Sequence, residues 1–385
     1  MNLTIVSLRA SNQFSSSPLV STQMNLHISK SMFSHHFSSF LYARKGLIAQ
    51  KTRFSHSLNS AIVLDSIQRS GKVFTSTESF GEDIEYTITN CAFSKCTSTS
   101  GSGAIKCAKL PLTSTFTIEK TGFDSCSGTI GGAFDLTTQK ITLNNCCFRF
   151  CTATVSGAAF KCSATKEFNI NQLLVARCHG SDTIYASCKS TATYRAANIT
   201  GNQDSKDLAT FIGDNLALQY TTLSDNDINV GLYPLATSAP QMAQFTNFIR
   251  NVGKYSICVT DQFTFHGISF VDEKTSFAVK NDKKVYCQLR DVVTTATKLD
   301  GNFFTEVICA NPTTGQAITQ SVLSNKYEEC WALIPSIDTS TGMSWKIKSL
   351  VIVSVILLIF VLVLIYRKTC GNKYGLSGQR LAYTL

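Results

Sequence analysis

A short pattern recurs along the middle of the chain, in which a large apolar residue is followed three positions later by Cys or Asn. Successive apolar members lie 24 to 30 residues apart. The pairs are Phe93/Cys96, Phe123/Cys126, Phe148/Cys151, Val175/Cys178, Ile199/Asn202, Leu223/Asn226 and Phe248/Asn251. A nearly constant period of this size is typical of repeat proteins. We therefore expect one solenoid rather than several independent domains.

Within each repeat, apolar and polar residues alternate in short stretches, as they do in half-buried β-strands. One set of stretches precedes the apolar anchor, at residues 86–88, 116–118, 141–143 and 168–170. A second set follows it, at residues 104–105, 133–134, 159–160 and 209–211. Helical periodicity is absent from this region. The pattern predicts an all-β parallel β-helix with about 25 residues per coil.

The stacking of coils assigns a role to each repeated position. Coils of a β-helix stack at the inter-strand spacing of about 4.8 Å, so equivalent residues form columns along the axis. We expect the apolar anchors to form an interior ladder. The Cys and Asn members should occupy a corner of each coil, where an Asn side chain can hydrogen-bond backbone groups of neighbouring coils.

The chain before the clear repeats is less regular. We expect residues 1–59 to form an N-terminal segment that is Ser-rich at first and then contains degenerate early coils near Phe33 and Phe54. A conventional signal peptide is not visible, because the first apolar run is short and ends at Arg9.

The β-helix is expected over residues 60–325. Its register loosens beyond Asn251, with Phe270/Glu273 and Val322/Asn325 as candidate coils. Residues 326–348 are interpreted as a C-terminal cap and stalk.

An uncharged apolar run of eighteen residues extends from Ser349 to Tyr366. Its length suits a helix that crosses a bilayer, and Arg367 and Lys368 close it as a stop-transfer pair. We therefore expect a transmembrane helix over residues 349–366, with a buried core helix as the alternative.

The last segment, residues 367–385, is short and basic, with four positive charges and no acidic residue. Because positive charge favours the cytosolic side, we expect a cytosolic tail and an outward-facing solenoid. The lack of a visible signal peptide supports the opposite arrangement, a C-terminally inserted anchor with a cytosolic solenoid.

Composition agrees with a β-solenoid that has a Phe-rich interior and a hydroxyl-rich exterior. Charged residues make up 16% of the chain, and it contains 25 Phe. The formal net charge is +10, but no basic run interleaved with aromatic residues occurs, so nucleic-acid binding is not expected.

The fifteen cysteines follow the repeat. The cysteines of the corner column should lie about 5 Å from their neighbours, which is within disulfide range. Cys91 and Cys146 should instead lie two coils apart in a second column. Buried thiols explain this distribution best, and some disulfides remain an alternative. No zinc-ribbon spacing is present, so we expect no metal site and no cofactor.

A His-His pair at His35 and His36 lies in an early coil, with His56 in the next. Metal binding there is not favoured, because no carboxylate or Cys stands at ligand spacing.

The sequence motifs of the repeat resemble those of the chlamydial polymorphic outer-membrane proteins and related protist surface proteins. Those repeats pair Gly-Gly-Ala-aliphatic with Phe-x-x-Asn. Here Gly131 to Phe134 reads Gly-Gly-Ala-Phe, and Phe248 to Asn251 matches the second phrase. The resemblance covers roughly residues 60–275 and implies a right-handed parallel β-helix with adhesive roles. The chain departs from the bacterial members in ending with one apolar segment rather than a barrel.

Parallel β-helices also include enzymes that cleave polysaccharides with clustered carboxylates. The richest acidic stretch here contains Asp204, Asp207, Asp214, Asp225 and Asp227. Because Asp is an ordinary turn residue, we interpret these positions as structural and expect no catalytic residues. Asn198 begins the sequon Asn-Ile-Thr and is a candidate glycosylation site.

Together these features predict a single-pass glycoprotein of the plasma membrane, whose β-helical ectodomain serves adhesion or recognition at the cell surface. Its partners would be the lipid bilayer and glycan or protein ligands on a host, a neighbouring cell or the matrix. The alternatives are a membrane-tethered polysaccharide-active enzyme and a structural surface-coat component without a specific ligand.

Overall fold

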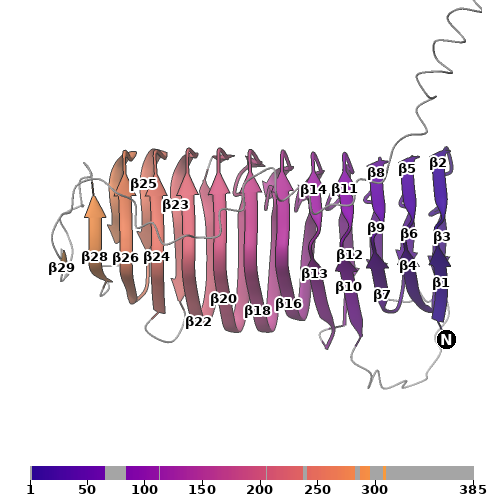
Figure 1. The fold of residues 1–385 in the computed structure, drawn as a ribbon, viewed down its shortest axis with the longest axis horizontal. Coiled ribbons are helices and arrows are strands. Elements are labelled where there is room, and N and C mark those ends of the chain that lie inside the picture. Colours follow the sequence, from indigo (N-terminus) through magenta and orange to yellow (C-terminus); the bar gives the residue numbers. More distant parts are fainter. Residues whose placement is uncertain are drawn as a thin grey trace, which may run out of the picture. The chain divides into compact units, whose positions relative to one another are not determined.

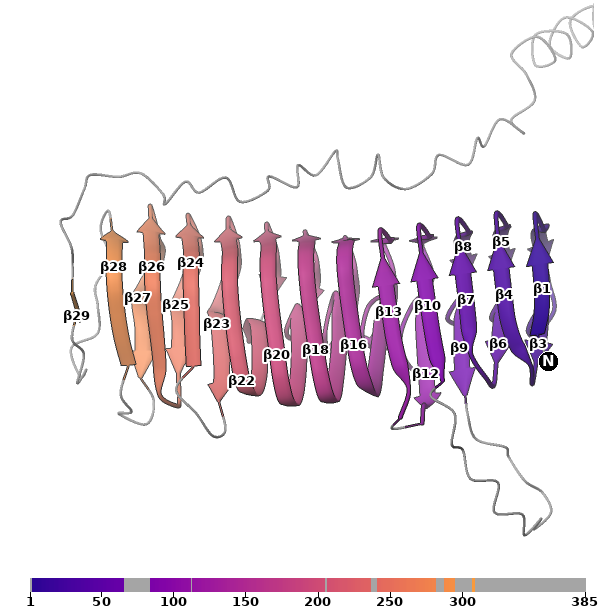
Figure 2. The ribbon, with the colours of Figure 1, turned by 60° about the horizontal axis from the view of Figure 1, so that its bottom comes forward.

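The computed structural model describes residues 2–65, 84–111, 113–204, 206–236, 241–281, 287–294 and 307–308. All of them belong to the compact unit Met1–Pro335. The expected coil at Val322/Asn325, the cap and stalk, the apolar segment 349–366 and the basic tail lie outside the described residues. The described residues form a parallel β-solenoid of about 11 turns with about 24 residues per turn, as the repeat predicted (Figure 1, Figure 2).

The strands join into one sheet that winds around the axis, and every pairing is parallel. The first three coils contain β1 (Asn2–Val6), β2 (Arg9–Gln13), β3 (Val20–Thr22), β4 (Asn25–Ser29), β5 (Met32–His36), β6 (Leu41–Ala43), β7 (Leu47–Gln50), β8 (Arg53–Ser57) and β9 (Ile62–Asp65). The next two contain β10 (Glu85–Thr89), β11 (Ala92–Ser94), β12 (Ile105–Lys109), β13 (Thr115–Glu119), β14 (Gly122–Asp124) and β15 (Ser127–Ile130).

In the later coils, four strands run around corners without a break and have 16 to 18 residues, namely β16 (Phe134–Arg149), β18 (Phe160–Ala176), β20 (Ile184–Thr200) and β22 (Asp207–Ser224). The other strands of these coils are β17 (Thr152–Ser156), β19 (His179–Gly180), β21 (Gln203–Asp204), β23 (Asp227–Ala236), β24 (Gln241–Ile249), β25 (Val252–Val259), β26 (Phe263–Val271), β27 (Lys274–Asn281), β28 (Cys287–Thr294) and β29 (Val307–Ile308).

Each coil contributes a strand to each of three faces. Face A begins with β1, β4, β7, β10 and β13, face B with β2, β5, β8, β11 and β14, and face C with β3, β6, β9 and β12. Residues 2–59, where the sequence predicted an N-terminal segment with degenerate early coils near Phe33 and Phe54, thus contribute coils to the same sheet. The sequence obscured the first coil because its ladder position is Ala10, which pairs with Phe33.

Two corners of each coil are made by residues in the left-handed conformation. Corner 1, between faces A and B, is formed by Lys30, Lys51, Asn90, Lys120, Asn145, Gln172, Ala196, Tyr220 and Phe245 and their equivalents. Corner 2, at the end of face B, is formed by His35, His56, Lys95, Ser125, Phe150, Arg177, Gly201, Asp225, Arg250 and Asp272. A non-glycine residue in this region costs about 1–2 kcal/mol, so the stacked neighbours must maintain it.

The interior of the solenoid contains the expected ladder of anchors. Phe93, Phe123 and Phe148 stack with ring centroids 4.9 Å apart. Phe54 stacks on Phe93 at the same distance, and Phe33 stacks on Phe54. Val175, Ile199, Leu223, Phe248 and Phe270 continue the column in register. Burial of such a column is the main source of stability in a solenoid.

The Cys and Asn members of the repeat directly follow corner 2. Six of the seven donate to the carbonyl oxygen of the anchor in the preceding coil, as Cys126 Sγ does to Phe93 (3.8 Å) and Asn226 Nδ2 to Ile199 (3.0 Å). The same contact is made by Cys96, Cys151, Asn202 and Asn251. Cys and Asn therefore replace each other because both supply a donor at one point.

The Asn residues also accept hydrogen bonds from backbone N–H groups of the preceding coil. Asn226 Oδ1 accepts from the backbone N–H of Asn202 at 2.9 Å, and Asn251 Oδ1 accepts from that of Asn226 at 3.1 Å. Glu273 ends this ladder, since its Oε1 accepts both the backbone N–H and the side-chain amide of Asn251 at 2.8 Å. Its Oε2 accepts the Ser256 hydroxyl at 2.7 Å.

The described cysteines other than Cys147 carry free thiols, and Cys147 is disulfide-bonded. Cys91 and Cys146 follow corner 1 and lie two coils apart, with the Thr121 hydroxyl between them. Burial raises the pKa of both thiols to about 12. These cysteines are buried packing residues that donate to carbonyl oxygens.

Candidate functional site

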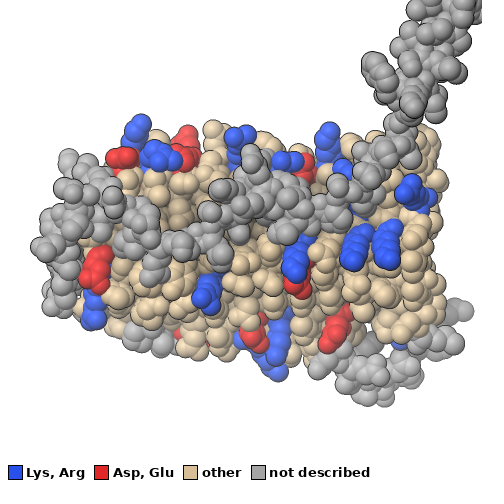
Figure 3. Space-filling model, viewed as in Figure 1, with Lys and Arg blue, Asp and Glu red and all other residues tan. Residues whose placement is uncertain are grey.

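The outward side of face A carries hydroxyl and amide side chains in regular rows. One row passes through Thr4, His27, Ile48, Thr87, Thr117, Thr142, Asn169 and Thr193 in successive coils. A neighbouring row contains amide pairs, including Asn171 Nδ2 donating to Asn144 Oδ1 at 3.2 Å and Gln219 Nε2 to Gln244 Oε1 at 3.1 Å. In the view of Figure 3 most of the described surface is uncharged. Such a face offers many hydrogen-bonding groups at the coil spacing of about 4.8 Å.

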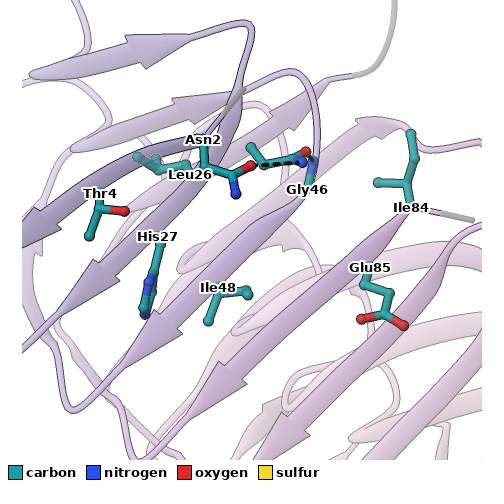
Figure 4. Close-up of a pocket in the computed structure, with 9 residues that line it drawn as sticks. Asn2, Thr4, Leu26, His27, Gly46, Ile48, Ile84 and Glu85 are labelled. Carbon is teal, nitrogen blue, oxygen red and sulfur yellow. Dashed lines mark hydrogen bonds between the residues drawn. The ribbon is translucent and has the colours of Figure 1, made fainter. Parts of the chain in front are cut away.

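A hollow of about 330 Å³ interrupts face A in the first four coils. Its lining comes from four neighbouring strands and the turns beside them, as Figure 4 shows. The lining residues are Asn2, Thr4, Asn25, Leu26, His27, Gly46, Ile48, Ile84 and Glu85.

Gly46 creates this hollow, because it leaves a gap in the outward row between Asn25 and Glu85. The Gly46 N–H donates to Asn25 Oδ1 at 3.1 Å, and Asn25 Nδ2 donates to Asn2 Oδ1 at 3.3 Å. A Cβ atom at Gly46 would lie 2.9 Å from the carbonyl oxygen of Glu85. The close approach of neighbouring backbones thus requires glycine, and the missing side chain opens the hollow.

The hollow presents both donors and acceptors. The Glu85 carboxylate and the Asn2 and Asn25 amides are exposed at its wall. The Nε2 atom of His27 is buried and has no hydrogen-bond partner among the described residues. This set can hydrogen-bond a hydroxyl-rich ligand, and it contains no nucleophile held by a base.

The five aspartates of the acidic stretch do not gather into one site. Asp225 lies at corner 2, where the Arg250 guanidinium donates a hydrogen bond to each of its carboxylate oxygens at 2.7 Å. Asp204 pairs with Gly180 and Asp227 with Gln203, so these two are offset by one position along neighbouring strands. Burial and the charge of Asp182 raise the pKa of Asp207. No group of three or more His, Cys, Asp or Glu side chains that could hold a metal occurs in the described part of the chain.

The histidines of the early coils have separate positions. His35 and His56 stack at corner 2 with ring centroids 4.3 Å apart. Burial and the proximity of His35 lower the pKa of His56. His36 is buried, with its ring nitrogens 2.9 and 3.1 Å from the carbonyl oxygens of Gln13 and Ser17. The imidazole of His36 therefore points away from those of His35 and His56, and the three rings do not share one site.

Asn198 lies in the middle of β20, paired on one side with Leu174 and on the other with Thr222. Its neighbours Ala197 and Ile199 are buried, so Asn198 faces outward as the alternation predicts, but it is only partly exposed.

Comparison with family models, with curated proteins and with solved structures finds no match for this chain. Among the residues that the structure describes, no helix is long and apolar enough to span a membrane. The expected span from Ser349 to Tyr366 lies outside those residues. The class that the structure defines is a parallel β-solenoid protein with a polar outer face.

The hollow was not predicted from the sequence. Its signal is the glycine directly before β7, and the importance of this position becomes visible only when Leu47 is aligned with Tyr86 across an intervening stretch of the chain. The ladder was predictable because its apolar and Cys or Asn members recur three positions apart in every repeat.

Proposed function

We propose that this chain displays its β-solenoid at the cell surface for adhesion or recognition, held by the apolar segment 349–366. The observation that carries the proposal is the outward side of face A, where hydroxyl and amide groups repeat over successive coils. A rigid surface of this kind suits many weak contacts with an extended ligand, because little conformational entropy is lost when it binds.

Two further elements of the proposal come from the sequence. The resemblance to the outer-membrane repeat family implies right-handed winding of the coils. The stop-transfer pair Arg367 and Lys368 favours a cytosolic tail and an outward solenoid, on which Asn198 would be open to glycosylation.

Labelling of intact cells tests the display of the solenoid. A membrane-impermeant amine reagent should modify exposed lysines such as Lys30, Lys51 and Lys95, while an epitope placed after Leu385 should be detected only in permeabilised cells. Modification of these lysines only after permeabilisation would contradict the proposed orientation.

Truncation tests the anchor. A chain that ends at Lys348 should move from the membrane pellet to the soluble fraction, because it lacks the only long apolar run. Recovery of the truncated chain in washed membranes would exclude the segment 349–366 as the anchor. A chain lacking only residues 369–385 is the matched control and should remain in the pellet.

A further inference from the structure

Charge is distributed unevenly along the solenoid. Residues 2–65 contain six basic side chains and one acidic side chain, Asp65. Residues 84–281, by contrast, contain sixteen basic and fourteen acidic side chains in their described part. Basic side chains gather toward the N-terminal end of the solenoid in Figure 3. The first three coils are therefore a local region of positive potential.

The basic side chains of these coils are not neutralised by ion pairs within the described chain. Every ion pair found there involves residues from Glu119 onward. Asp65, the one acidic residue, accepts a hydrogen bond from the Tyr42 hydroxyl at 2.7 Å. Lys30 and Lys51 are exposed and occupy equivalent corner-1 positions in neighbouring coils, about 4.8 Å apart along the axis. Their mutual repulsion would be relieved by a bound anion.

These cations flank the hollow on face A. Lys30 and Lys51 directly follow β4 and β7, the strands that bring His27 and Ile48 to the hollow. Lys45 directly precedes Gly46 at the other end. Hydrogen-bonding groups for hydroxyls thus lie between positive charges on both sides.

We propose that the first coils bind a linear acidic polysaccharide, with one sugar ring in the hollow and its sulfate or carboxylate groups on Lys30, Lys51 and Lys45. Asn2, Asn25 and Glu85 bind the ring hydroxyls. This inference deepens the proposed recognition function and names the ligand class.

The arrangement of side chains favours a polysaccharide over other polyanions. The hollow has no Phe, Tyr or Trp in its lining on which a nucleic-acid base would stack. Membrane docking would require a cluster of large apolar side chains beside the cations. The exposed Phe14, Phe37 and Leu58 follow corner 2, at the opposite end of the face B strands from Lys30 and Lys51, and the exposed apolar side chains on face A beside these lysines are the aliphatic Val6 and Ile48.

Binding of heparin fragments to the purified full-length chain in detergent tests the proposal. The double variant Lys30→Gln/Lys51→Gln should lose about tenfold or more in affinity at about 0.15 M salt, and its affinity should depend less on salt. The control Lys189→Gln/Lys206→Gln removes two exposed lysines of later coils and should bind as the wild type does. Asn25→Ala should weaken binding without changing the salt dependence, because it removes a neutral contact to a ring hydroxyl.

The same affinity in both double variants would overturn the proposal. Tighter binding to duplex DNA, or to vesicles of phosphatidylcholine and phosphatidylserine, than to heparin would also overturn it. The Lys30→Arg/Lys51→Arg variant keeps the charge and should bind heparin, which separates loss of charge from loss of fold. Because binding is measured on purified protein, its failure is distinguishable from failure of surface display.

Discussion

At corner 2 a single contact decides which residues the repeat accepts. Cys151 Sγ donates to the carbonyl oxygen of Phe123 at 3.6 Å, and Asn251 Nδ2 donates to that of Leu223 at 2.9 Å. The amide forms the stronger hydrogen bond and also accepts one from a backbone N–H of the preceding coil. In the Asn half of the column, each side chain therefore joins a polar network that includes backbone N–H groups.

Asn226→Ala tests the network. The substitution leaves the buried N–H of Asn202 and the buried carbonyl of Ile199 without their partners. We expect the free energy of unfolding to fall by about 2–4 kcal/mol, measured from urea denaturation. Asn215→Ala, at an exposed position of β22, is the control and should change it by less than about 0.5 kcal/mol. Equal losses in the two variants would contradict the role of the ladder.

Glu273 makes stability depend on pH. Burial raises the pKa of its carboxyl above the ordinary 4.5, although hydrogen bonds from Ser256 and Asn251 oppose the shift. A carboxyl with a raised pKa binds its proton more tightly in the fold. The protonated Glu273 carboxyl therefore stabilises the fold fully below pH 4.5. This contribution is lost as the pH rises through the pKa of the folded state.

The difference in urea midpoint between the wild type and Glu273→Gln should consequently fall as pH rises through this interval and then become constant. A difference that grows with pH would show that the hydrogen bonds to the carboxylate outweigh its burial.

At the scale of the element, the turn before face C depends on close backbone contact between coils. Gly131 has φ of 70°, and a Cβ atom on Gly132 would lie 2.0 Å from the carbonyl oxygen of Ala158. Glycine is therefore required by the neighbouring coil as well as by the turn itself.

Gly132→Ala should lower the free energy of unfolding by about 3 kcal/mol or more, because the backbones must separate. Gly101→Ala is the matched control, since its Cβ meets only the flexible side chain of Lys106, at 3.1 Å. Thermal unfolding followed by circular dichroism compares them. A similar melting temperature for both variants would refute the close-contact argument.

Strands and ladder positions were predictable because they repeat, but two features were not. The first coil was missed because Ala10 replaces a large anchor there. The hollow at Gly46 depends on which residues become neighbours across coils, as Gly46 does with Asn25 and Glu85. The periodicity of the sequence shows which residues form a column along the axis. A missing side chain in a column, as at Gly46, is found only once the register between coils is known.

At the scale of the molecule, each coil contacts only the coils beside it, so whole coils should be removable. Deleting residues 178–201 joins Arg177 to Asn202 and places Asn202 at the corner that Cys178 occupied. We expect this variant to fold with a β-rich circular dichroism spectrum and a modestly lower melting temperature.

Deleting only residues 178–189 is the control for this prediction. It removes about half a coil, which breaks the register of every later strand, so this variant should not form a stable solenoid. Folding of the half-coil deletion, or failure of the full-coil deletion, would contradict the independence of the coils.

The parallel pairing has a mechanical consequence. Hydrogen bonds between coils lie along the solenoid axis, so tension between the two ends loads them one coil at a time instead of shearing all of them together. Each coil that opens releases about 24 residues, or roughly 80 Å of extended chain. Under drag the protein would therefore extend stepwise and dissipate force, so a ligand bound to the first coils could remain attached while coils at the other end of the solenoid unwind.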